Sequence, residues 1–233
     1  MSDKSALPLY VQISELLIRD IGAGRYQDGE RLPPERDFAK ALNTSVVTLR
    51  KALALLENQG MLERVHGSGN YVRARSDPRS VYSFFRVELI AGGGLPTAEV
   101  LDVSRCAKPA DLPAFGTSAS AHRIRRLRRL SGAPAVLEEI YLDGSHVDEV
   151  AREELSESLY LYYRERLGLF ITRAQDQLSL ASVPDWAPDA FGPRSGTPCL
   201  MAERISWDRD GTRAEVSRNW IDTNVARYVA RIK

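Results

Sequence analysis

Residues 32–72, LPPERDFAKALNTSVVTLRKALALLENQGMLERVHGSGNYV, decide the fold of the first part of this chain. The two prolines near its start suit the first turn of a short helix, because a helix start does not need their missing N–H groups. Apolar residues then recur on one face of that helix: Phe38, Ala39 and Leu42. Asn43 and Thr44 suit a tight turn, so the first helix is expected to end there.

A second, longer helix is predicted directly after this turn. Ser45 is its candidate N-cap, because the hydroxyl can accept a hydrogen bond from an orphan N–H group of the first turn. Gly60 ends the helix at a position that suits a left-handed residue. Two short strands, residues 61–65 and 70–73, are then joined by a glycine-bearing tip. The apolar face of the helix follows i, i+3, i+4, i+7 spacing: Leu49, Ala52, Leu53 and Leu56.

The order helix, turn, helix, two-stranded ribbon is typical of a winged helix-turn-helix, a fold that reads DNA. The major groove admits one helix, and the first turn of that helix reaches base edges. Glycines in the ribbon let the main chain approach phosphates closely, where its N–H groups can donate. The alternative is an ordinary helical hairpin followed by a β-turn. The ribbon placed directly after the second helix favours DNA reading.

Four motifs resemble those of the GntR family of bacterial transcription regulators: PLYVQISELLIRDIGAG, LPPERDFAKAL, SVVTLRKALALLENQGML and HGSGNYV. Carried over by motif position, the resemblance implies operator contacts from Arg36, Ser45, Thr48, Arg50, His66 and Gly67. Val46 departs from the family pattern, in which many members carry an Arg, and this puts the usual operator sequence in doubt. Pro34 also departs, because a small residue is commoner there.

Composition fits a two-domain protein but does not identify its partner. The chain has 233 residues, and its 32 Lys and Arg nearly balance its 31 Asp and Glu, so charge alone would not reveal a DNA-binding protein. No apolar run reaches membrane length and no signal peptide is evident, so we expect a cytoplasmic protein without a membrane partner. Cys106 and Cys199 lack metal-ligand spacing and the histidines are scattered, so we expect buried thiols, no metal site and no cofactor.

The remainder of the chain predicts an α+β fold with an antiparallel sheet. Turns at residues 131–134 and 210–212 join two adjacent pairs of strands as hairpins. Helices are expected near residues 147–155 and 158–167, with Gly168 ending the second. We therefore expect a DNA-binding domain over residues 1–74, a polar linker over 75–82 and a second domain over 83–233. The candidate strands are residues 99–106, 122–130, 135–141, 171–180, 199–207 and 214–220.

Three segments of this second part are similar to the UTRA effector domain of the HutC subfamily, which shares the chorismate-lyase fold. They are RRLRRLSGAPAVLEEIYLD, SLYLYYRERLGLFITRA and ERISWDRDGTRAEVSRNWIDTNVARYVARIK. The resemblance implies an antiparallel sheet and a site for a small effector. Its motifs are weaker than those of the DNA-binding part.

Five arginines between residues 123 and 129 suggest where that effector binds. On a strand, Arg126 and Arg128 share one face, and two guanidiniums on one face suit a phosphate or a carboxylate. The resemblance implies that Glu138, Ser158 and Tyr160 complete the site. The alternative is a solvated charged strand or a set of interface salt bridges.

Phe85 leaves the chemical class of the effector open. Relatives that respond to sugar phosphates often carry a hydroxyl at the position that the motif assigns to Phe85, and an aromatic ring cannot donate a hydrogen bond there. The effector can therefore be a sugar phosphate, a carboxylate or a larger, partly apolar molecule.

Together these features predict a homodimeric transcription regulator, most simply a repressor, that binds an inverted-repeat operator. A small anionic metabolite would shift the protein between states that fit and do not fit the operator. Two alternatives stay open: a constitutive DNA-binding protein without an effector, and a chorismate-lyase-like enzyme. A shared fold does not imply a shared activity, and no nucleophile–base pair that would support an enzyme is evident.

Overall fold

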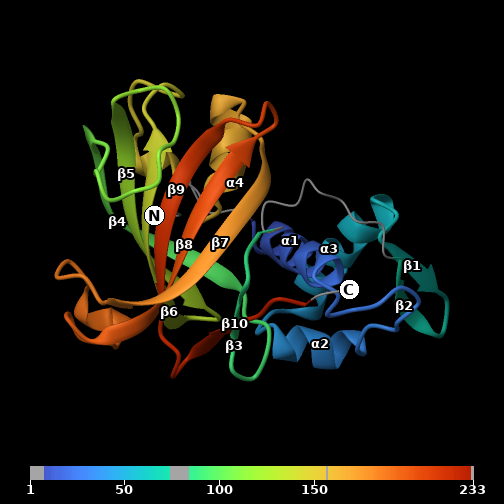
Figure 1. Cartoon of the computed structure of the whole chain (residues 1–233). Helices are drawn as coiled ribbons and strands as arrows, with labels where there is room; N and C mark the ends of the chain where they lie inside the picture. Colours follow the sequence, from blue (N-terminus) through green and yellow to red (C-terminus); the bar gives the residue numbers. More distant parts are fainter. Residues whose placement is uncertain (1–7, 74–83, 156, 232–233) are drawn as a thin grey trace. The chain divides into compact units, whose positions relative to one another are not determined.

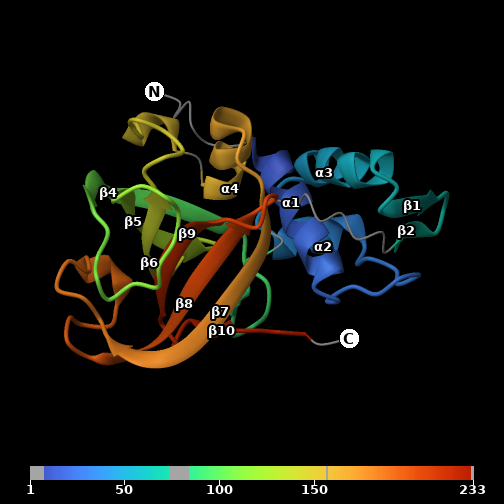
Figure 2. The same ribbon diagram turned by 45° about the horizontal axis from the view of Figure 1, so that its top comes forward.

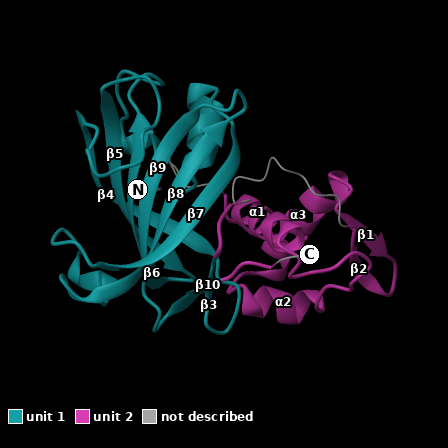
Figure 3. Ribbon diagram, in the orientation of Figure 1, with its two compact units in different colours: residues 1–5, 87–228 teal, residues 6–86, 229–233 magenta. Residues whose placement is uncertain are grey.

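The computed structural model describes residues 8–73, 84–155 and 157–231. The chain divides into two compact units, which Figure 3 shows in different colours. The N-terminal unit comprises, among the described residues, 8–73, 84–86 and 229–231, and the C-terminal unit runs over 87–228. Residues 229–231 thus belong to the N-terminal unit, which the sequence did not indicate. The linker expected at residues 75–82 lies outside the described residues.

The N-terminal unit contains the predicted helix-turn-helix and ribbon (Figure 1). Its apolar faces meet in one core, to which α1 and α3 contribute Ile13, Leu16, Leu49 and Leu56, each at most 1% exposed. The ribbon β1–β2, called the wing below, is antiparallel. The elements are α1 (Leu9–Gly22), α2 (Glu35–Ala41), α3 (Val46–Asn58), β1 (Leu62–Val65) and β2 (Gly69–Val72).

Local signals set the ends of α3 as predicted. The Ser45 hydroxyl accepts a hydrogen bond from the Thr48 N–H at 3.0 Å, which is the geometry of an N-cap. Asn43, in the turn before the helix, has a left-handed φ of 50°, and Gly60 after it has a φ of 69°. These residues can adopt that region at low cost, so the turn and the helix stop are encoded locally.

The C-terminal unit is built on one six-stranded antiparallel sheet, which Figure 2 shows from a second direction. All six candidate strands are confirmed, in the spatial order β4-β5-β6-β9-β8-β7. A short ribbon of β3 (Val87–Leu89) and β10 (Ala226–Tyr228) was not predicted, because three residues are too few to show a period. The six strands are β4 (Pro96–Ala107), β5 (Ser120–Leu130), β6 (Ala133–Asp143), β7 (Ile171–Ser182), β8 (Pro198–Asp208) and β9 (Arg213–Ile221).

The two helices expected in this unit had different outcomes. The second is present as α4 (Leu159–Tyr162), which continues as a π-helical turn (Tyr163–Leu167) and stops at Gly168 with a φ of 63°. The helix predicted over residues 147–155 is wrong, since only a 3-10 turn forms there, at Arg152–Glu154. Tertiary bonds account for the difference. The Val147 carbonyl lies 2.9 Å from the ring of His122, and Arg152 donates to main-chain carbonyls of β4.

Both faces of the sheet are covered by apolar residues. On one face, Ile124, Ile140 and Leu142 pack with Leu159 and Tyr163 of the helical segment. On the other face, two clusters are centred on aromatic rings and branched side chains. Their buried members include Phe115, Val216, Leu127, Phe191 and Trp220. Alternate residues along the strands thus pack on opposite faces of the sheet, as the sequence predicts.

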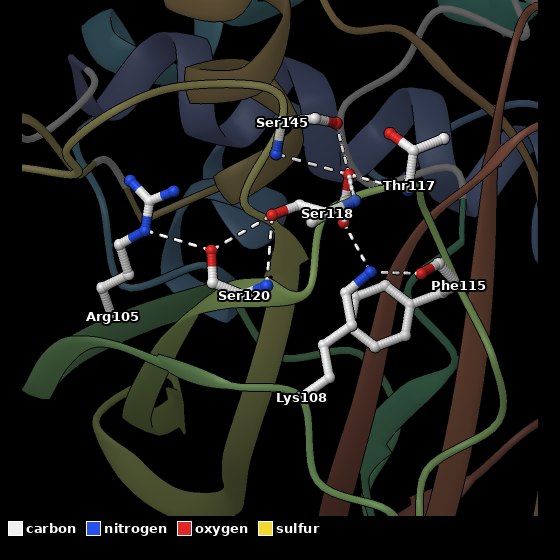
Figure 4. A network of polar contacts seen from close by, with 8 residues as sticks. Arg105, Lys108, Phe115, Thr117, Ser118, Ser120 and Ser145 are labelled. Atoms are coloured by element: carbon white, nitrogen blue, oxygen red, sulfur yellow. Dashed lines mark hydrogen bonds and ion pairs between the residues drawn. The ribbon is translucent and has the colours of Figure 1, made fainter.

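One acidic side chain, Asp143 at the end of β6, fastens the loop between β4 and β5. Its carboxylate lies 2.6 Å from the Lys108 ammonium and accepts the N–H groups of Thr117 and Ser118 at 3.2 and 3.1 Å. Ser145 donates to it as well. Figure 4 shows these groups around the carboxylate. Burial opposes ionisation of this carboxyl, but the hydrogen bonds from Lys108 and Ser145 outweigh burial and lower its pKa to about 2.

Candidate functional site

The residues that the sequence assigns to DNA contact form an exposed surface on the N-terminal unit. This candidate DNA-reading surface consists of Arg36 at the start of α2, the first turns of α3 and the wing tip. The side chains of Arg36, Ser45, Arg50, His66 and Gly67 are exposed, and Thr48 is half-buried. Solvent access is what contact with a nucleic acid requires.

Four of these six residues line one hollow between α2, α3 and the wing: Arg36, Arg50, His66 and Gly67. The other two, Ser45 and Thr48, do not line it. They lie side by side at the start of α3, with their hydroxyl oxygens 2.8 Å apart. Between them, Val47 points outward and is 64% exposed, so the first turn of α3 presents an apolar side chain as well as two hydroxyls.

Two charged residues of this surface were missed in the sequence analysis. Glu35 accepts a hydrogen bond from Arg50 Nε at 2.6 Å and lies 3.5 Å from the guanidinium of Arg64 on β1. Both also line the hollow. Arg64 could have been selected from the sequence, because it is a basic residue two positions before the predicted wing tip. Nothing in the local sequence pattern indicated that Glu35 would join the helix to the wing.

In the C-terminal unit, the structure brings Arg126, Arg128 and Glu138 together. Arg126 lies directly opposite Glu138 in the β5–β6 register, and Arg128 is on the same face of β5. Arg126 Nη2 lies 2.7 Å from Glu138 Oε2, and Arg128 Nε lies 2.6 Å from Glu138 Oε1. All three residues are at most 5% exposed. This arginine fork, Arg126 and Arg128, is therefore buried around one carboxylate and is not a solvated charged strand.

Burial and charge pairing act on the fork in opposite directions. Burial would raise the pKa of Glu138, but Arg126 and Arg128 outweigh it and hold that pKa below its usual value. Burial lowers the pKa of the Arg126 guanidinium. Its Nε–H is buried and has no hydrogen-bond partner among the described residues. A buried donor without an acceptor is costly, and an oxygen of a ligand would relieve that cost.

Ser158 directly follows Glu157, a residue whose main chain contacts the fork. The carbonyl of Glu157 accepts from Arg126 Nη1 at 3.3 Å and from Arg128 Nη2 at 3.4 Å. The buried Ser158 hydroxyl then accepts the N–H of Leu161 at 3.4 Å and caps α4. The fork is thus bonded to the main chain of Glu157, two residues before α4 begins at Leu159.

Tyr160 belongs to a second buried polar cluster on β8 and β9. Its hydroxyl lies 2.9 Å from Ser206 Oγ and 3.4 Å from Glu215 Oε1. Tyr163 donates to the same carboxylate at 2.6 Å. Burial raises the pKa of Tyr160 and of Glu215, and the Arg126 charge also acts on Glu215. The sequence analysis did not select three members of this cluster: Ser206, Glu215 and Tyr163. Ser206 and Glu215 are direct partners in the β8–β9 register.

Phe85, expected beside the effector, belongs to the N-terminal unit. Its ring centroid lies 5.5 Å from the guanidinium carbon of Arg19 on α1. That distance is typical of a cation–π contact. The contact gives Phe85 a role at α1, and the sequence motif gave no sign of it.

The described residues contain neither a membrane-spanning helix nor a metal-binding cluster. No helix there is long and apolar enough to span a membrane. Within the same residues, no group of three or more His, Cys, Asp or Glu side chains is placed to hold a metal ion. The Cys199 thiol, on β8, is buried and donates to the Ile221 carbonyl at 3.0 Å.

Comparison with known proteins accounts for both units. Residues 9–72 match the bacterial regulatory proteins of the gntR family, and residues 91–227 match the UTRA domain. The transcriptional regulator SmoD of Agrobacterium fabrum is 61% identical over 98% of this chain and 97% of its own length. The transcriptional repressor NagR of Bacillus subtilis is 25% identical over 94% of this chain and 92% of its own.

A solved structure supports the fold independently. The regulator YydK from Bacillus subtilis superposes with a TM-score of 0.54 at 22% identity, over 97% of this chain and all of that one. Family membership places the protein among transcription regulators with an effector-binding domain, and not among enzymes. The chain belongs to the gntR family of bacterial transcription regulators and, because it carries a UTRA domain, to its HutC-type subfamily.

Proposed function

We propose that this protein is a homodimeric repressor that binds an inverted-repeat operator and releases it when a small anion binds the arginine fork. The observation that carries the proposal is the fork itself: two guanidiniums, buried on one sheet face, with the Nε–H of Arg126 lacking a partner among the described residues. Such a site suits the oxygens of a phosphate or a carboxylate.

On the DNA side, Arg50 and the hydroxyls of Ser45 and Thr48 meet base edges or phosphates from α3. Arg36 and the wing tip, His66 and Gly67, contact the flanking backbone. The surplus of positive charge is small, so two copies of the surface on a two-fold symmetric dimer would supply the affinity. Repression is supported by a relative, NagR, that is named a repressor and aligns over most of this chain.

On the effector side, Glu138 keeps its bonds to the fork and orients both guanidiniums. The anion takes the Nε–H of Arg126 and lies near the start of α4, where Ser158 and Tyr160 reach its polar substituents. Binding changes the operator affinity only by the difference in effector affinity between the two states, which is typically about 1–3 kcal/mol.

The proposal is tested in four measurements on the full chain. Selection from a random duplex library should yield an inverted repeat, and light scattering of the complex should give two chains per duplex. Thermal unfolding should then be screened against inorganic phosphate, sugar phosphates and sugar carboxylates. The stabilising compound should release the selected duplex. Stabilisation by no compound in that screen, with normal duplex binding, would favour a constitutive DNA-binding protein.

A further inference from the structure

We infer that Glu35 is a positioning residue of the DNA-reading surface: it orients Arg50 for contact with DNA and joins the recognition helix α3 to the wing. The inference rests on the proposed DNA contacts of α3. Glu35 is the first residue of α2, and its side chain is only 19% exposed, whereas those of Arg50 and Arg64 are 58% and 55% exposed. The acid is thus covered while the two bases it holds face outward.

The geometry at Arg50 decides which edge of its guanidinium faces DNA. Glu35 Oε2 accepts from Arg50 Nε at 2.6 Å, so the side-on edge of the guanidinium is engaged. Within the described residues, Nη1 and Nη2 of Arg50 make no hydrogen bond. The end-on pair of N–H groups is therefore left for a bidentate contact with a guanine edge or a phosphate.

The second oxygen of Glu35 extends the arrangement to the wing. Glu35 Oε1 lies 3.5 Å from Arg64 Nη2, and Arg64 stands on β1 opposite Asn70 in the ribbon register. One carboxylate thus touches arginines from α3 and from the wing, while its own backbone begins α2. A single side chain thus bridges the three elements that line the hollow.

If Glu35 acted only through its negative charge, it would weaken DNA binding, whereas a positioning residue strengthens it. A carboxylate in a hollow that faces phosphates repels them, so removing it should strengthen DNA binding at any sequence. A positioning residue behaves differently, because its loss frees Arg50 to adopt many rotamers. Binding to the preferred sequence then weakens, although the net charge has become more favourable. The sign of the change therefore separates the two roles.

Asp37 provides a matched control two residues further along α2. It lines the same hollow and is exposed, and its side chain makes no ion pair or hydrogen bond among the described residues. Glu35→Gln and Asp37→Asn each remove one negative charge without a change in side-chain size. Only the first removes the carboxylate that holds Arg50.

The test measures the affinity of the full-length variants for two duplexes. One is the sequence that the wild-type protein selects from a random library, and the other is a shuffled duplex of the same composition. We expect Glu35→Gln to lower affinity for the selected duplex about tenfold, which is within the discrimination of one bidentate contact. Asp37→Asn should leave that affinity unchanged or raise it. Both variants should keep the wild-type melting temperature.

An Arg50→Ala background shows whether Glu35 acts through Arg50. In that background Glu35→Gln should no longer weaken binding to the selected duplex, because there is no guanidinium left to orient. If Glu35→Gln strengthens binding to both duplexes, as Asp37→Asn does, Glu35 is only a repelling charge and the inference fails. If the wild-type protein selects no sequence at all, the proposed function fails and the role of Glu35 falls with it.

Discussion

Arg50 shows how one residue can combine local and tertiary requirements. It follows Leu49, which is fully buried in the core, so its own side chain is turned toward the hollow between α3 and the wing. The helix places it five residues beyond Ser45, the cap that begins α3. Its guanidinium is then held by Glu35. Position along the helix and orientation in space thus have separate causes.

A first prediction concerns the arginines of the surface. Arg36→Ala and Arg50→Ala should each weaken binding to the selected operator by roughly 1–3 kcal/mol, because each removes a charged contact with DNA. A gel-shift titration at fixed salt measures the effect. Arg73→Ala is the control, since Arg73 pairs with Glu63 and does not line the hollow. Unchanged affinity in both hollow variants would exclude the docking proposed for α3.

At the scale of elements, the loop between β4 and β5 depends on Asp143. This carboxyl has a folded-state pKa of about 2, below its usual value of 3.8. Its ionised form therefore stabilises the fold fully above about pH 4, and that contribution is lost as the pH falls toward 2. We expect about 1–2 kcal/mol from this source, a range that allows for screening by nearby solvent.

Asp143→Asn tests this second prediction. The amide cannot ionise, so the variant should be less stable than the wild type at pH 7, and the difference between the two should shrink at pH 3. Urea unfolding at both pH values measures it. If the unfolding free energy of both proteins falls equally between pH 7 and pH 3, groups other than Asp143 cause the loss of stability in acid.

A third prediction concerns Gly116 in the same loop. A Cβ at this position would lie 2.0 Å from Asp143 Cγ, and the φ of 56° is left-handed. Gly116→Ala should therefore lower the unfolding free energy by about 2–4 kcal/mol, from steric overlap and backbone strain together. Gly132→Ala is the matched control, because its φ of 86° is also left-handed but a Cβ there meets nothing within 4 Å. If the two variants lose the same unfolding free energy, the loop around residue 116 must shift enough to remove the overlap with Asp143.

At the scale of the whole molecule, the fork should control operator release without contributing to operator binding. Arg126→Lys with Arg128→Lys keeps two positive charges beside Glu138 but removes the planar donors that grip an anion. We expect this double variant to bind the operator normally and to lose release by the effector. Release is measured by fluorescence anisotropy of a labelled duplex.

The structure explains why lysine is a better replacement here than alanine. Removing both arginines would leave the buried carboxylate of Glu138 without a charge partner, which typically costs about 3–5 kcal/mol of stability. Arg125→Lys is the control, because Arg125 lies on the opposite face of β5 and pairs with Glu139. Normal release in the fork variant would assign Arg126 and Arg128 a purely structural role.

Most of the fold was predictable from the sequence because its signals are local. The prolines before α2, the Ser45 cap and Gly60 mark helix ends within a few residues of where they act. The alternation along residues 122–130 placed Arg126 and Arg128 on one face. Prediction failed for residues 147–155, where tertiary bonds override a helical pattern, and for β3 and β10, which are too short to show a period.

The sequence by itself determined the class of protein, the order of its elements and which arginines share a strand face. Only the tertiary structure decided what those arginines touch. Glu138 faces Arg126 because of strand register, Tyr160 reaches Glu215 across two elements, and Glu35 meets Arg50 because α2 packs beside α3. Caps and periods act within a turn or a strand, whereas these charge pairs join residues that only packing brings together.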